Sequence, residues 1–204
     1  MVISYLLRNL KIDELLPFGD VEIIRQNFDM LDMPFKFDLA IGVDPGQVHM
    51  GVCTLFRSGE WKDTIIGQAY EITFPSKQGL VERVEYTEKV LEYVFSISLP
   101  NKLPEKTVAC VEQAAFGAPY GQAALAESRT AAVVSLLHNK ITPRIAPPAT
   151  IRKTVFGNGR KRAEEFLLWS DLKPNSASAL ACSLFAIFME DMDEKEKKPV
   201  RKTS

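Results

Sequence analysis

The chain has 204 residues, of which 46% are hydrophobic and 25% are charged, enough apolar material for one folded domain. This composition excludes an intrinsically disordered chain, a collagen-like rod and a disulfide-stabilised miniprotein. The 25 Lys and Arg residues nearly balance the 26 Asp and Glu residues, so the net charge of −1 gives no overall attraction to nucleic acid or to a membrane.

Leucines recur at helical spacing near the N-terminus until the sequence Pro17-Phe18-Gly19 interrupts them. The leucines concerned are Leu6, Leu7, Leu10, Leu15 and Leu16. This pattern predicts a helical extension and connector over residues 1–38, to which we assign no chemistry.

The pattern changes at residue 39, where a short and nearly continuous apolar run ends at an aspartate, as is typical of a buried central strand. Two further strands are predicted over residues 51–56 and 64–70. Short Pro-Gly and Ser-Gly segments separate these three runs, so we expect a three-stranded antiparallel meander.

Helices and strands then alternate to residue 189, which predicts a mixed sheet with helices on both faces. The expected elements are a helix over 81–95, a strand over 108–111, an alanine-rich helix over about 122–139, a strand over 142–145 and two or three helices after Pro147-Pro148. The almost entirely charged residues 190–204 are predicted to form a flexible tail.

The three cysteines Cys53, Cys110 and Cys182 are far apart, lie in apolar surroundings and lack the CxxC spacing of a zinc site. We therefore expect reduced, buried thiols and a cytoplasmic or nucleic-acid-associated intracellular location rather than secretion. No apolar run approaches the roughly 20 residues of a transmembrane helix, so neither a membrane span nor a signal peptide is predicted.

Two acids follow predicted strands directly: Asp44 ends the run that begins at residue 39, and Glu112 ends the run 108–111. Carboxylates at strand ends of one open sheet can meet over its edge, where such sheets usually build their sites. Each acid alone could instead be a turn residue or a solvated strand end. Asp44-Pro45-Gly46 followed by Gly51 favours the site, because it places a carboxylate on a rigid turn before a glycine that allows close backbone approach.

These segments, with three others, resemble the RuvC-like Holliday-junction resolvases of the RNase H superfamily. The resemblance covers about residues 39–189 and rests on Ile41-Gly42-Val43-Asp44-Pro45-Gly46 with Gly51, on Val111-Glu112-Gln113, on residues 151–159 (IRKTVFGNG) and on Ala179-Leu180-Ala181. It implies an RNase H-like α/β fold with a mixed five-stranded sheet, a homodimer, and Mg²⁺-dependent cleavage of DNA at four-way junctions.

The resemblance also implies two further acids at the start of the last helix, whereas this chain has Asn175 and Ser178 there. Two-metal phosphodiester hydrolysis needs a cluster of carboxylates that holds two Mg²⁺ about 3.5–4 Å apart. Asp44 and Glu112 remain as metal ligands, with Asn175 and Ser178 as uncharged members of the catalytic set, so we expect weak Mg²⁺ binding or none. Asp171 is the nearest acid that could replace a lost ligand.

Basic residues are concentrated between Arg129 and Ala163, where there is no Asp or Glu. Such a segment can follow a phosphate backbone even when the whole chain is neutral, although it could also be an ordinary solvated basic face. The predicted DNA contacts within it are Arg152, Lys153, Arg160, Lys161 and Arg162, the last three after a flexible Gly157-Asn158-Gly159 turn. Phe116 and Tyr120, in a loop rich in Gly and Ala, could stack on bases or could instead pack against the next helix.

Three hypotheses for function follow. The first is a RuvC-like protein that binds branched or distorted DNA and cleaves it weakly or not at all. The second is an inactive RuvC-like fold that serves as a DNA-binding or scaffolding subunit of a transcription or recombination complex. The third, a nucleotide-binding ATPase of the same superfamily, is disfavoured because the chain lacks a second Gly-rich phosphate loop at the right place.

Overall fold

A computed structural model describes residues 7–31, 33–57, 64–75, 79–113, 122–166 and 172–196 of the chain. Its strands form one sheet in the order β1-β2-β5-β4-β3-β6-β7. The strands are β1 (Leu7–Phe18), β2 (Val21–Leu31), β3 (Leu39–Asp44), β4 (His49–Arg57), β5 (Thr64–Thr73), β6 (Thr107–Glu112) and β7 (Arg144–Ala146). The helices are α1 (Leu80–Ser98), α2 (Gln122–His138), α3 (Pro148–Phe156), α4 (Ala163–Phe166) and α5 (Pro174–Glu196).

The five strands expected from the sequence are present and lie next to one another. β3, β4 and β5 form the predicted antiparallel meander, and β6 and β7 add parallel strands on the other side of β3. β3 is buried along almost its whole length because it lies at the centre of these five strands and is covered on both faces. The mixed α/β class predicted from the sequence is therefore confirmed.

The helical prediction for the N-terminal segment is wrong, since β1 and β2 form an antiparallel hairpin. β2 pairs with β5 along residues 22–31 and 64–73, so the hairpin extends the expected five strands to seven. The leucine spacing is compatible with a helix, but as a strand β2 forms ten residue pairs along the otherwise open edge of β5, which satisfies backbone groups of β5 that a helix would leave unpaired. In β2 the alternation of Val21 and Ile23 with outward residues follows the two-residue period of a strand.

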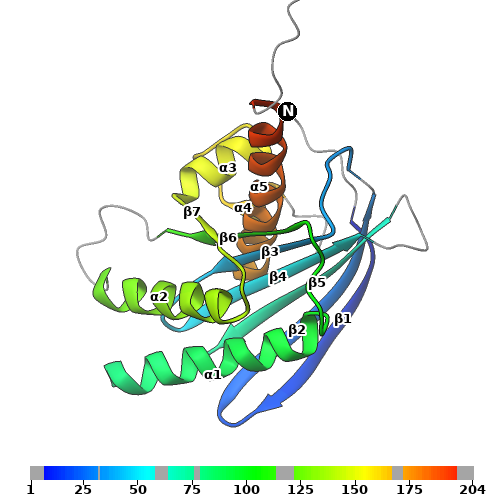
Figure 1. Ribbon diagram of the computed structural model, residues 1–204. Helices are drawn as coiled ribbons and strands as arrows, with labels where there is room; N and C mark the ends of the chain where they lie inside the picture. The colour runs from blue at the N-terminus through cyan, green and yellow to red at the C-terminus, as the bar shows by residue number, and fades with distance from the viewer. Residues whose placement is uncertain are drawn as a thin grey trace, which may run out of the picture.

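Helices lie on both faces of the sheet (Figure 1), and a hydrophobic core lies on each face. Helices α1 and α2 cover one face, where Val90, Leu91 and Ala132 pack on the central strands. Helix α5 covers the other face, and its residues from Ser176 to Phe188 are buried except for the half-buried Ser178. Cys53, Cys110 and Cys182 are free and buried, as predicted.

The C-terminal end of α5 differs from a second expectation, because residues 190–196 of the predicted flexible tail continue the helix, whereas residues 197–204 lie outside the described residues. Arg144 on β7 forms ion pairs with Glu190 and Asp193, and Lys106 lies 3.1 Å from Glu194. These charges attach the last turns of α5 to the sheet. No helix in the described part of the chain is both long and apolar enough to cross a membrane.

Candidate functional site

The predicted carboxylates lie in one row that crosses the sheet. Asp44 and Glu112 each follow directly after the paired residues Val43 and Val111, so they end neighbouring parallel strands side by side. Asp44 also pairs with Gly51 on β4, and Gly51 pairs with Glu71 on β5. Residues opposite one another in a sheet present their side chains to the same face, so this row brings Glu112, Asp44 and Glu71 to one face of the sheet.

Gly51 allows the first turn of α5 to rest directly on this row. A Cβ atom at Gly51 would lie 2.0 Å from the carbonyl oxygen of Asn175 and 3.0 Å from the backbone nitrogen of Ser176. Any side chain here would therefore force α5 away from β4. The close approach of α5 explains why a glycine is needed at position 51. Since Gly51 pairs with Asp44 on one side and with Glu71 on the other, the start of α5 lies between these two acids.

The first turn of α5 supplies hydrogen-bond donors to carboxylates of the sheet. The Nδ2 of Asn175 donates to Oε1 of Glu71, and hydrogen bonding by the Ser178 side chain acts to lower the pKa of Asp44. The backbone N–H and hydroxyl of Ser176 donate to Oε2 of Glu71 at 2.8 and 3.1 Å. Glu71 thus caps the N-terminus of α5 from a neighbouring strand.

The pKa values of Asp44 and Glu112 are both raised. Burial is the main cause for Asp44, whose pKa is about 7, and the charges of Glu71 and Glu164 add to it. Burial and the charge of Asp44 raise the pKa of Glu112 to about 8. The hydrogen bond from Ser178 and the positive charge of Arg152 oppose the rise at Asp44, and Arg152 also opposes the rise at Glu112. Without added cations, the site therefore holds its negative charge poorly at neutral pH.

The sequence analysis missed two acids that act on Asp44, namely Glu71 and Glu164. Glu71 is only 7% exposed, and it shares the inward alternation of Ile65 and Ala69 along β5. The sequence did contain a signal for Glu71, because it is a single acid at an inward position of an otherwise apolar strand. Glu164 is the second residue of α4, and its Oε1 is 3.7 Å from Nη1 of Arg162.

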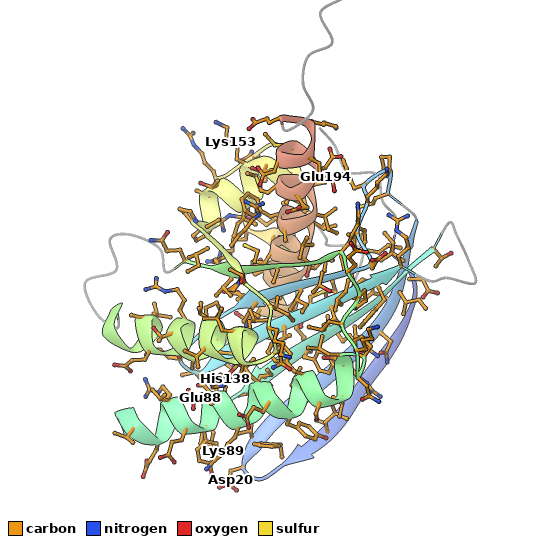
Figure 2. The ribbon with its side chains drawn as sticks, in the orientation of Figure 1. Asp20, Glu88, Lys89, His138, Lys153 and Glu194 are labelled. Carbon is orange, nitrogen blue, oxygen red and sulfur yellow. The ribbon has the colours of Figure 1, made fainter. Side chains whose placement is uncertain are left out.

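The predicted DNA-contacting cations fall into two groups. Lys153, Arg160, Lys161 and Arg162 are exposed, and Figure 2 shows Lys153 on the outer side of α3. Arg152 is instead half-buried and acts on the carboxylates. Arg144, also in the basic segment, is held by the acids of α5.

The segment between α3 and α4 is built from local hydrogen bonds. Gly157 ends α3 in the left-handed conformation with φ of 78°, and its N–H donates to the carbonyl of Lys153. The side-chain oxygen of Asn158 accepts from the N–H of Arg160 at 2.9 Å. The predicted turn is therefore present, and these bonds hold its backbone in place.

The donor set does not fit two Mg²⁺ ions. Asp44 and Glu112 are the two carboxylates at the ends of the strands, and among the described residues no three His, Cys, Asp or Glu side chains converge closely enough to hold a metal ion. Asn175 adds a neutral amide whose nitrogen faces Glu71. The predicted stacking residues Phe116 and Tyr120, and the candidate ligand Asp171, lie outside the described residues.

Comparison with solved structures gives a known precedent for this arrangement of strands and helices. The structure of Thermus thermophilus RuvC in complex with a Holliday-junction substrate matches with a TM-score of 0.58 and 18% identity, over 76% of this chain and 96% of that chain. A second structure of Thermus thermophilus RuvC matches with a TM-score of 0.59 and 17% identity, again over 76% of this chain and 96% of that chain. This is the RuvC fold. Nearly all of RuvC has a counterpart here, whereas about a quarter of this chain has none in RuvC. No protein-family model and no curated protein matches the sequence.

Proposed function

We propose that this protein binds branched or otherwise distorted DNA through its RuvC fold and cleaves it weakly or not at all. One observation carries the proposal: Asn175, where the resemblance implies an acid, instead donates a hydrogen bond to Glu71. A position at which the resemblance implies metal-binding charge therefore provides a hydrogen-bond donor to a carboxylate of the sheet. We infer a site that keeps the form of a nuclease site and has lost most of its capacity for Mg²⁺.

The charge balance supports weak metal binding. Four carboxylates would bring about four negative charges to two Mg²⁺ ions, which prefer anionic oxygen ligands. Asp44 and Glu112 supply two at most, and burial and neighbouring carboxylates raise the pKa of each, which destabilises even these negative charges. A second Mg²⁺ would therefore have little charge to hold it.

Exposed cations next to the site support DNA binding. Lys153 on α3 and the residues 160–162 before α4 are exposed, and Glu164 on α4 acts on Asp44. The basic turn and the carboxylates thus lie at the same edge of the sheet, which is the arrangement needed for a phosphate backbone to pass over the site. The neighbouring RuvC structure contains a Holliday-junction substrate, which supports a junction as the substrate to test first. Phe116 and Tyr120 remain predicted stacking residues.

A second candidate function is a binding or scaffolding subunit of a larger transcription or recombination complex. The β1–β2 hairpin favours it, because the hairpin extends the sheet beyond the five strands that form the RuvC-like core. Such a subunit would bind DNA without cutting it and would contact protein partners. A homodimer, which the resemblance implies, is the alternative assembly.

The test is a titration of a labelled four-way junction and a matched linear duplex, in EDTA and in Mg²⁺ or Mn²⁺, with binding and strand scission scored in the same samples. We expect selective junction binding in EDTA and little scission with either metal. Equal affinity for junction and duplex at the same salt concentration would contradict the junction specificity. Efficient symmetric cleavage by the unmodified protein would contradict the loss of catalysis.

Restoring the acids gives the matched gain-of-function test. The double variant N175D/S178D places a carboxylate directly against Glu71, which repels it. Adding E71Q replaces that acceptor by an amide that can donate to the new acid. We therefore expect Mg²⁺-dependent cleavage in the triple variant and less in the double variant. If the triple variant folds and binds junctions but still does not cut, the missing ligands are not the reason for inactivity.

A further inference from the structure

Side chains from β5 and β2 hold the start of α5 on the sheet. Glu71 on β5 accepts hydrogen bonds from the side chain of Asn175 and from the backbone N–H and the hydroxyl of Ser176, the last two at 2.8 and 3.1 Å. Gln26 on β2 accepts from the backbone N–H of Lys173, directly before α5, at 3.2 Å. Both acceptors are almost fully buried, with exposed fractions of 7% for Glu71 and 3% for Gln26. The start of α5 is thus fixed by side chains of the protein itself.

The pairing of the strands explains why both acceptors reach the same end of α5. Gln26 pairs with Ala69, which lies two residues before Glu71 on β5 and belongs to the core under α5. Opposite residues and residues two apart share one face of a sheet, so both acceptors point to the face that α5 covers. Gly51 pairs with Glu71 from β4 and leaves room for the backbone of α5. The N-terminal hairpin therefore contributes to the site through Gln26.

The first turn of α5 has no acid of its own. Negative charge stabilises a helix N-terminus, and Glu71 supplies that charge from the neighbouring strand. An acid at position 175 would instead face Glu71 at hydrogen-bond distance. Two buried carboxylates at that distance repel one another unless a proton or a cation lies between them. The amide of Asn175 removes this requirement, because it donates a hydrogen bond to Glu71.

We propose that Glu71 and Gln26 anchor the start of α5 in place of divalent cations, so that the carboxylate edge of the sheet is assembled without metal. Glu71 is then a positioning residue, which sets where Asn175 lies relative to Asp44 and does not itself contact DNA. The poor fit of the donor set to two Mg²⁺ ions has the same origin, because the strand carries the acceptor and the helix carries the donor. The inference rests on the proposed function only in taking position 175 as one at which the resemblance implies an acid.

The first test measures the thermal unfolding midpoint of N175D, with N101D as the matched change at an exposed position. An acid in the first turn of a helix ordinarily stabilises it, so without the anchor N175D would leave the midpoint unchanged or raise it. We expect a midpoint in EDTA that is lower by about 4 °C or more, because the new carboxylate would face Glu71. Mn²⁺ should restore the midpoint, since a cation can bind between the two carboxylates. N101D should match the unmodified protein in both conditions.

The double variant E71Q/N175D exchanges the donor and the acceptor. It should restore the midpoint without Mn²⁺, because glutamine can donate to the new acid while its oxygen still accepts from Ser176. A double variant no more stable than N175D would overturn the inference, and so would an N175D midpoint in EDTA at or above that of the unmodified protein.

Amide hydrogen exchange of the unmodified protein gives a measurement that needs no variant. We expect the N–H of Ser176, which donates to Glu71, to exchange at the same rate in EDTA and in Mg²⁺ to within about twofold. Protection of this N–H that develops only in Mg²⁺ would show that a cation holds α5 and would overturn the inference. Unfolding and hydrogen exchange require no DNA, so failure of the inference is distinguishable from failure of the DNA-binding proposal.

Discussion

The E71Q substitution tests the role of Glu71 in holding α5 on the sheet. Glu71 accepts hydrogen bonds from the Asn175 amide and from the backbone and hydroxyl of Ser176, and it is only 7% exposed. Hydrogen bonds to a charged group contribute about 1.5–3 kcal/mol each. Glutamine keeps one acceptor oxygen but turns the other position into a donor that faces another donor, so one to two of these bonds are lost.

Relief of repulsion with Asp44 partly offsets this loss, because the charge of Glu71 raises the pKa of Asp44. We therefore expect the free energy of unfolding to fall by about 2 kcal/mol, with a decrease in midpoint of about 4–8 °C for a chain of this length. Urea denaturation monitored by circular dichroism measures the first quantity and calorimetry the second. E22Q removes the same charge at an exposed position of β2 and should change stability by less than about 0.5 kcal/mol. If E71Q is as stable as E22Q, Glu71 does not hold α5.

Three further predictions concern packing, pH and the end of α5. G51A should destabilise the protein by about 3 kcal/mol in urea denaturation, because the new Cβ would lie 2.0 Å from the Asn175 carbonyl oxygen. The control G79A should cost less than about 1 kcal/mol, because its Cβ would come no closer than 3.6 Å to Glu82. The raised pKa values of Asp44 and Glu112 mean that the folded state retains protons that the unfolded state releases, so without metal the free energy of unfolding should fall as pH rises from about 4 to about 8. D44N/E112Q should flatten that dependence, and a profile unchanged by these substitutions would contradict the assignment. R144M should increase amide hydrogen exchange over residues 189–196, because it removes the ion pairs with Glu190 and Asp193. The control K153M should leave this exchange unchanged. Equal exchange in both variants would show that these ion pairs do not hold the end of α5.

Local pattern identified the core of the fold because each central element has a strong periodicity of its own. The run ending at Asp44 is apolar throughout, as a strand covered on both faces must be, and the structure buries it as expected. The N-terminal leucines had no such unique pattern, since they are compatible with a helix and with a strand. Their conformation depends on the pairing of β2 with β5, which is a contact between segments about forty residues apart.

The sequence by itself predicted the α/β class, the two acids at strand ends and the uncharged residues Asn175 and Ser178 in the last helix, because these follow from residue type and order along the chain. Only the tertiary structure decided what those residues contact. Glu71 contacts Asn175 across 104 positions of sequence because Gly51 lets α5 lie on β4, and Ala146 lies beside Glu112 because β7 pairs with β6. Sequence spacing does not tell which distant side chains are buried next to one another. The electrostatic interaction of buried charged groups depends on their distance in space and not on their order along the chain.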